Sequence, residues 1–176
     1  SEIIYIDDFF VGDHTYKEGS YREDESTAST ASIEDIADCK RRSEHFIDFY
    51  SNKTICDFGC GEGTFLINTV KNTKKSFGVE IQENYLKNIS KKNIDCTDNI
   101  DNIDNDSLDS CFMFHVLEHL EEPIHHLESI KSKLAFGGNV IIEVPHARDF
   151  LIKNLNIPEF INFTLWSQHL ILHTRE

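Results

Sequence analysis

The sequence has few basic residues and no long hydrophobic run. Its 17 lysines and arginines stand against 31 aspartates and glutamates, which gives a formal net charge of −14 at pH 7. An acidic surface repels phosphate backbones and anionic membranes, which argues against general nucleic-acid binding. No apolar stretch reaches the roughly 20 residues that a membrane-spanning helix requires. We therefore expect neither a nucleic acid nor a membrane as a partner.

A C-x-x-C pair is also absent. Because the number of cysteines is odd and all lie in expected core elements, we predict reduced thiols and a cytoplasmic protein. These cysteines are Cys39, Cys56, Cys60, Cys96 and Cys111.

The 176 residues, 39% of them hydrophobic, fit one domain with one core. Residues 1–31 include the small polar run Ser26–Ala31. We interpret them as an N-terminal segment that can act as a lid. The main domain is expected over residues 32–176, beginning with a helix over Ser32–Tyr50.

The stretch from Thr54 to Leu66 has the pattern of a strand, a glycine loop and a helix start. Thr54–Phe58 is short and mostly apolar, as buried parallel strands are. Gly59, Gly61 and Gly63 follow as G-x-G-x-G, and glycine lets a ligand approach the backbone closely. A dinucleotide site has G-x-G-x-x-G, but Thr64 occupies the position of its third glycine. An ordinary glycine-rich turn is a second alternative.

An acid ends the next expected strand, Lys75–Glu80. Glu80 lies 17 residues beyond Gly63. In nucleotide-binding α/β folds an acid about 20 residues after the loop hydrogen-bonds the ribose hydroxyls. The spacing therefore predicts a ribose-binding role for Glu80.

Strands and helices continue to alternate, which is typical of a parallel α/β sheet. The remaining expected elements are a helix over Asn84–Lys92, a strand over Asn93–Cys96, a strand over Ser110–His115, a helix over Pro123–Phe136 ended by Gly137-Gly138, and a strand over Asn139–Val144.

Four segments between Thr54 and Pro145 resemble the class I S-adenosylmethionine (SAM) methyltransferases of the small-molecule type. They read DFGCGEG, VEI, SLDSCFMFHVLEHLEEP and GGNVIIEVP. The resemblance implies a doubly wound, mostly parallel sheet with strand order 3-2-1-4-5 and SAM as cofactor. The implied cofactor-binding residues are Asp57, Phe58, Gly59, Cys60, Gly61, Gly63, Glu80, Ile81, Thr97, Asp98, Phe114 and His115.

The absence of two motifs reduces the number of acceptor classes that fit the resemblance. Amino-group methyltransferases of DNA and glutamine carry Asn/Asp-Pro-Pro-Tyr/Phe where this chain reads His115-Val-Leu-Glu, and cytosine enzymes carry Pro-Cys where it reads Pro145-His146. The pattern therefore favours O- or C-methylation of a small-molecule acceptor. A SAM-binding regulatory or scaffold protein without turnover and an NAD-dependent enzyme are the alternatives.

The run from His115 to His119 reads H-x-x-E-H. A zinc peptidase needs both histidines on one helix, whereas His115 ends an expected strand. Some relatives carry E-x-x-E-H here and bind a divalent ion, and His146 is then a candidate additional ligand. Because a histidine replaces the first glutamate, we predict no metal. His115, His119 or His146 is instead expected to act as a catalytic base, while His169 and His173 are left without a role.

After Pro145 the sequence is too short for the helix and antiparallel strand pair that end the fold in this family. We therefore expect the C-terminal strand pair to be missing and the chain to be truncated or a natural short form. The apolar edge at Val140–Val144 would then be exposed. Either Leu165–Thr174 or a second copy of the chain is expected to cover it, and the short apolar run Leu170-Ile171-Leu172 favours the first.

Overall fold

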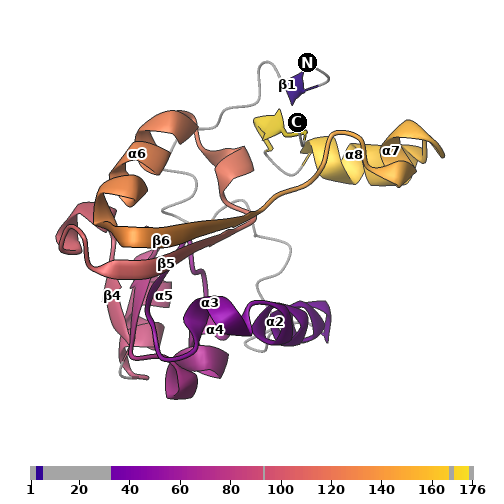
Figure 1. Cartoon of the computed structure of the whole chain (residues 1–176). Helices are drawn as coiled ribbons and strands as arrows, with labels where there is room; N and C mark the ends of the chain where they lie inside the picture. Colours follow the sequence, from indigo (N-terminus) through magenta and orange to yellow (C-terminus); the bar gives the residue numbers. More distant parts are fainter. Residues whose placement is uncertain (1–2, 6–32, 93, 167–168, 175–176) are drawn as a thin grey trace.

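The computed structural model describes residues 3–5, 33–92, 94–166 and 169–174. A five-stranded parallel sheet forms its centre, with the order β4-β3-β2-β5-β6 (Figure 1). The strands are β2 (Thr54–Phe58), β3 (Lys75–Val79), β4 (Asp95–Thr97), β5 (Leu108–Phe114) and β6 (Leu134–Glu143). Counted along the sheet strands alone, this is the predicted 3-2-1-4-5 order, so the doubly wound fold is confirmed.

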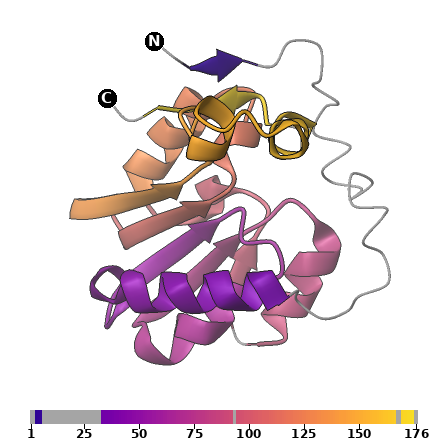
Figure 2. The same ribbon diagram turned by 90° about the vertical axis from the view of Figure 1, so that its right-hand side faces the viewer.

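Helices cover both faces of the sheet. One face carries α2 (Ile33–His45), α3 (Ile47–Tyr50), α4 (Thr64–Thr69) and α5 (Glu83–Ser90), and the other carries α6 (Pro123–Lys133). Figure 2 shows α2 running across its side of the sheet. Short 3-10 turns are η2 (Val70–Asn72), η3 (Ile100–Asn102) and η4 (Leu117–His119).

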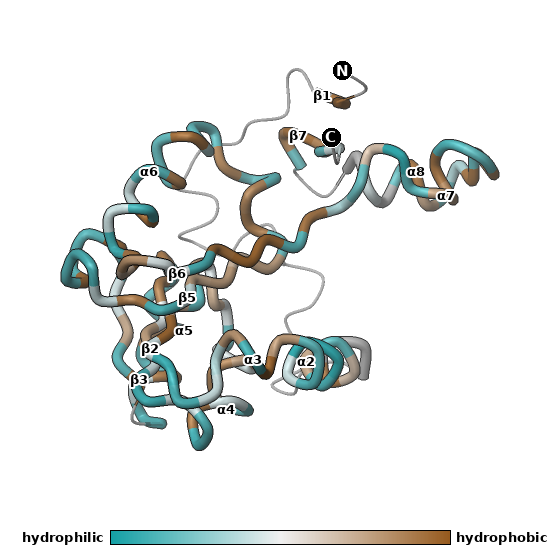
Figure 3. The backbone as a smooth tube through the Cα atoms, viewed as in Figure 1, coloured by the Kyte–Doolittle hydropathy of each residue, from teal (hydrophilic) through white to brown (hydrophobic). Residues whose placement is uncertain are grey.

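Successive residues of the strands contribute alternately to two hydrophobic cores, one on each face of the sheet. Ile55 and Phe112 are buried against α2 to α5, whereas Cys56 and Met113 are buried against α6 and the turns beside it. Successive side chains of a strand point to opposite faces, so a sheet covered on both sides needs apolar residues at nearly every position. Figure 3 shows hydrophobic residues along the strands and mixed colours along α2 and α6.

Most predicted boundaries differ from the structure by one or two residues, and two differences are larger. The helix expected over Ser32–Tyr50 is interrupted at Phe46, whose φ of −103° and ψ of 18° are not helical. The helix expected to end at Phe136 already ends at Lys133, and β6 begins at once. The register then shifts between Leu108 and Ser110, because the chain must pass through Gly137, with φ of +80°, before regular pairing begins.

The outer edge of β6 is not paired with any strand of the described segments. After Pro145 the chain turns away into α7 (Phe150–Lys153) and α8 (Pro158–Trp166). The strand β7 (Ile171–Leu172) pairs antiparallel with β1 (Ile4–Tyr5) in a separate two-stranded sheet. The prediction that Leu165–Thr174 covers the β6 edge is therefore wrong for the described part of that segment.

Three further predictions concern the cysteines, membrane-spanning helices and the N-terminal lid. The five cysteines are free thiols. Within these same ranges, no helix has the length and apolar character needed to cross a membrane. Of the predicted lid, residues 1–31, all but residues 3–5 fall outside the described part of the chain.

Candidate functional site

The glycine loop lies at the carboxyl ends of β2 and β3. The backbone N–H groups of Gly59 and Cys60 both donate to the carbonyl oxygen of Val79, at 2.8 and 3.1 Å. The φ angles of Gly59, Gly61 and Gly63 are +75°, +52° and +72°. Residues with a Cβ rarely adopt this left-handed region, so the loop conformation favours glycine at all three positions.

The three glycines differ in their surroundings. A Cβ at Gly59 would lie 2.4 Å from a methyl carbon of Val116, and one at Gly63 would lie 2.9 Å from Ile89. A Cβ at Gly61 would meet no atom within 4 Å. Gly59 and Gly63 therefore allow tight packing inside the protein, whereas Gly61 borders open space that a ligand can enter.

Glu80 lies directly beside this open space. Its side chain is buried, and Oε2 accepts a hydrogen bond of 2.8 Å from the Gly61 N–H. Oε1 accepts one of 3.0 Å from the N–H of Gln82. A carboxylate oxygen has two lone pairs, so both oxygens retain capacity for hydroxyl donors. The arrangement suits recognition of a vicinal diol.

Asp57 is buried at the end of β2. Burial raises the pKa of its carboxyl to about 7; the nearby charge of Glu80 adds to this rise, and Arg42 opposes it. The cause is that a low-dielectric site disfavours the charged form of an acid. The carboxyl is therefore poised between its two protonation states near neutral pH.

Residues expected at the adenine lie at the end of β3 and beyond β4. Ile81 and Asp98 are exposed. The Thr97 hydroxyl accepts from Asn102 Nδ2 at 2.7 Å and from the Asn99 N–H at 3.3 Å. These contacts shape the loop after β4 and leave Asp98 and Ile81 accessible to a ligand.

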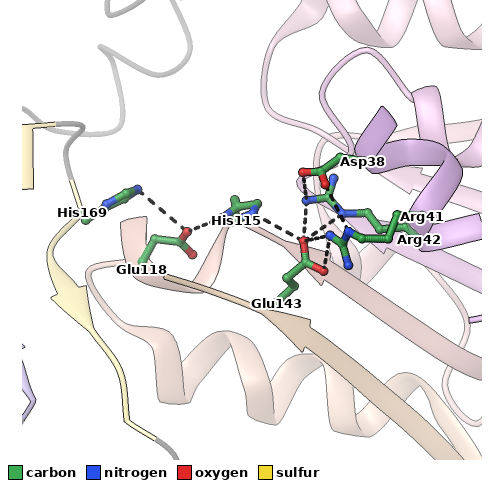
Figure 4. A network of polar contacts seen from close by, with 7 residues as sticks. All are labelled: Asp38, Arg41, Arg42, His115, Glu118, Glu143 and His169. Carbon is green, nitrogen blue, oxygen red and sulfur yellow. Dashed lines mark hydrogen bonds and ion pairs between the residues drawn. The ribbon is translucent and has the colours of Figure 1, made fainter. Parts of the chain in front are cut away.

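A charged network joins α2 to the ends of β5 and β6 (Figure 4). The Glu143 carboxylate accepts from Arg41 at 2.8 and 2.9 Å and from Arg42 Nε at 2.9 Å. His115 Nε2 lies 3.5 Å from the same carboxylate, and Arg41 also contacts Asp38. Burial alone would raise the pKa of Glu143, but its contacts with His115, Arg42 and Arg41 lower it. The sequence analysis did not single out Glu143.

Phe114 lies beneath this network. The Arg42 guanidinium carbon is 4.6 Å from the centre of its ring, within range of a cation–π contact. The ring also packs against Phe46 and Phe65, with centroid distances of 5.9 and 5.1 Å. Phe114 is thus both part of the core and a support for the charged groups above it.

His115 directly follows β5 and has a φ of +56°, a rare conformation for a residue with a Cβ. Its Nδ1 lies 3.3 Å from Glu118 Oε1. The hydrogen bonds to Glu118 and then Glu143 raise the pKa of the imidazole to about 9, against the effect of burial. The ring therefore bridges two carboxylates at the carboxyl end of β5 (Figure 4).

Three side chains that could bind a metal ion lie close together near His115. Glu118, His119 and His169 offer ligand atoms that all lie within 4.8 Å of one another. His146, which the sequence analysis paired with this region, is not part of this group; its Nδ1 accepts from the Arg148 N–H at 3.2 Å. His169 was left unassigned because no local pattern connects it with Glu118.

Solved structures with the same fold come from several organisms. A SAM-dependent methyltransferase from Archaeoglobus fulgidus is 22% identical, with a TM-score of 0.59 over 89% of this chain and 74% of that one. The PH0226 protein from Pyrococcus horikoshii is 15% identical, with a TM-score of 0.64 over 79% and 71%. A SAM-dependent methyltransferase from Mesorhizobium loti is 18% identical, with a TM-score of 0.54 over 60% and 52%.

The chain spans 57%, 52% and 38% of the chain length of three similar structures, the Mesorhizobium loti enzyme among them. No curated protein sequence matches significantly. A family model described as a methyltransferase domain matches residues 33–173. The predicted methyltransferase family is confirmed at the level of this domain. Because the match covers most of the sequence, the chain belongs to the methyltransferase-domain family, and its fold is that of the SAM-dependent methyltransferase from Archaeoglobus fulgidus.

Proposed function

We propose that the chain binds SAM at the carboxyl ends of β2 and β3 and transfers its methyl group to oxygen or carbon of a small-molecule acceptor. The observation that carries the proposal is the pairing of Glu80 with Gly61, at 2.8 Å, beside open space. One buried carboxylate thus orders the glycine loop and has capacity for the two ribose hydroxyls.

The proposed cofactor residues lie at the carboxyl ends of neighbouring strands, and each group of them contacts one part of SAM. Asp57, Phe58 and Cys60 accompany the three glycines around the methionine part of SAM. Glu80 accepts from the ribose, while Ile81, Thr97 and Asp98 border the adenine. Phe114 and His115, at the end of β5, lie toward the methyl end. This order places the ligand where the direction of strand connection reverses, the usual site in open α/β sheets.

Methyl transfer is an in-line displacement on a sulfonium, and its leaving group is neutral. The protein must mainly align the acceptor and, for an O–H or C–H acceptor, allow loss of its proton. We propose His115 as the residue that contacts the acceptor, because its half-exposed ring lies between Glu118 and Glu143. His119 and His146, the other predicted bases, stay predictions.

The strongly acidic composition favours neither nucleic acid nor an anionic membrane as the acceptor. The free thiols fit the reducing cytoplasm, where we place the protein.

Calorimetry with SAM, S-adenosylhomocysteine and NAD tests the cofactor. We expect the first two to bind and NAD not to bind; the reverse would overturn the proposal. Incubation of acceptor pools with SAM labelled at its methyl group then tests turnover. Label in a small molecule supports the enzyme, and SAM binding without incorporation favours the regulatory alternative. His115→Gln should lower kcat by a larger factor than it raises the Kd of SAM.

A further inference from the structure

Two separate parts of the chain bring together three metal-ligating side chains. Glu118 and His119 belong to η4, after β5, whereas His169 precedes β7. Their ligand atoms lie within 4.8 Å of one another. The Leu170 N–H also donates to the Glu118 carbonyl oxygen, at 2.7 Å, which holds the two parts in register.

Glu118 has an unusual environment for an acid. Its side chain is fully buried, and within the described residues Oε2 has no hydrogen-bond partner. Oε1 lies 3.3 Å from His115 Nδ1 and 3.9 Å from His169 Nε2 (Figure 4). A buried carboxylate oxygen without a partner is costly unless a cation compensates it. Oε2 therefore lacks the positive group or donor that would compensate its burial.

His169 has the orientation of a metal ligand. Its Nδ1 lies 2.7 Å from the carbonyl oxygen of Thr164, which can only accept, so Nδ1 carries the proton. In the neutral ring Nε2 then carries the lone pair, and this atom lies 3.9 Å from Glu118 Oε1. Ligating histidines commonly donate their other N–H to a backbone carbonyl, which fixes the ring and its tautomer. The His119 ring is 4.8 Å from the His169 ring, centre to centre.

We propose that Glu118, His119 and His169 bind a divalent transition-metal ion, with Zn²⁺ as the best match. Two imidazole nitrogens and one carboxylate oxygen suit zinc, whereas magnesium and calcium prefer oxygen ligands. Bonds of about 2.0–2.2 Å place neighbouring ligand atoms roughly 3–4 Å apart, so rotation of the side chains is enough to close the site. Three protein ligands also leave one position for water or substrate.

The ion would connect η4 to the C-terminal segment, residues 169–174. That segment contains β7, which is paired with β1. Binding would thus fasten β7 to the end of β5, next to His115. This differs from the sequence-based expectation of no metal, and the ligand that completes the set is His169 rather than His146.

The full chain, stripped with a chelator, is titrated with Zn²⁺ and Mg²⁺ by calorimetry, without SAM or acceptor. We expect one Zn²⁺ per chain, no comparable Mg²⁺ binding, and slower amide exchange in residues 169–174 with Zn²⁺. Absence of stoichiometric Zn²⁺ binding would overturn the site and leave the proposed methyl transfer untouched. Zn²⁺ binding without SAM binding would instead support the metal site and overturn the proposed methyl transfer.

Three variants locate the ion. Glu118→Gln keeps the shape of the side chain, His169→Ala removes a buried ligand, and His119→Ala removes a more accessible one. Each should weaken Zn²⁺ binding at least tenfold in protein whose circular dichroism is unchanged. His125→Ala, on the exposed side of α6, is the control and should bind as wild type. If the His119→Ala variant is folded and binds Zn²⁺ like the control, the proposed ligand set is wrong.

Discussion

The Gly61 N–H donates a 2.8 Å hydrogen bond to the carboxylate of Glu80, which ties the glycine loop to the end of β3. Glu80→Ala should weaken SAM binding by about 1–3 kcal/mol, the scale for losing a charged acceptor. Calorimetry measures the change. Glu83→Ala is the matched control, because Glu83 is exposed on α5 and pairs with Lys87. Equal SAM affinity in the two variants would remove the ribose role of Glu80.

Gly61 also allows the ligand space to be probed directly. Gly61→Ala places a methyl group in open space at a positive φ, so the expected cost in unfolding free energy is only about 1–2 kcal/mol. SAM affinity should nevertheless fall at least tenfold, because the methyl group occupies the space proposed for the ligand. Urea unfolding and calorimetry separate the two effects.

Gly137→Ala is the matched control for this experiment. Gly137 also has a positive φ, and a Cβ at this position would meet no atom within 4 Å, but it lies in β6 at the other end of the sheet. It should show the same loss of stability with unchanged SAM affinity. Gly59→Ala, by contrast, should cost about 2–5 kcal/mol, since its Cβ would overlap Val116. Unchanged SAM affinity in Gly61→Ala would place the ligand elsewhere.

Local patterns in the sequence were enough to predict the sheet and the cofactor loop. The bounds of β2 are those predicted, because an apolar run followed by alternating glycines leaves few alternatives. Glu80 was identified by its spacing from the loop, and the structure places it against Gly61. Both features depend on residues that are close in the sequence.

The rest depends on contacts between distant residues. Arg42 contacts Glu143, which lies 101 residues further along the chain. His169 joins Glu118 only because the chain returns after α8, and no spacing rule encodes that return. The same return pairs β7 with β1 rather than with β6. A pattern read along the chain cannot predict such partners.

Arg42 should contribute to stability as well as to the site. Its side chain is 15% exposed, and its guanidinium contacts Glu143 and lies over Phe114. Arg42→Gln should lower the unfolding free energy at pH 7 by about 1–3 kcal/mol, between the values for exposed and buried ion pairs. Lys40→Gln is the control, since the pair of Lys40 with Glu44 is 75% and 70% exposed and should contribute below about 0.5 kcal/mol. Equal unfolding midpoints in urea would contradict a structural role for Arg42.

Asp57 should make stability fall as pH rises. Its carboxyl has a pKa of about 7 in the folded protein, raised from 3.8 by burial and by Glu80 and partly offset by Arg42. Between these two values the folded state keeps a proton that the unfolded chain has lost. The favourable contribution of Asp57 is therefore complete below about pH 4 and lost as pH rises through about 7. At 1.36 kcal/mol per pKa unit, the full loss is at most about 4 kcal/mol.

Asp57→Asn removes this titration without changing the size of the side chain. Other groups also titrate between pH 4 and 8, so the quantity to measure is the difference in unfolding free energy between variant and wild type at each pH. That difference should shift in favour of the variant as pH rises from 4 to 8. Asp95→Asn, whose side chain is 63% exposed on β4, should show a nearly constant difference. A constant difference for Asp57→Asn as well would mean that Asp57 is already ionised in the folded protein at pH 4, held so by Arg42 against the burial that raises its pKa.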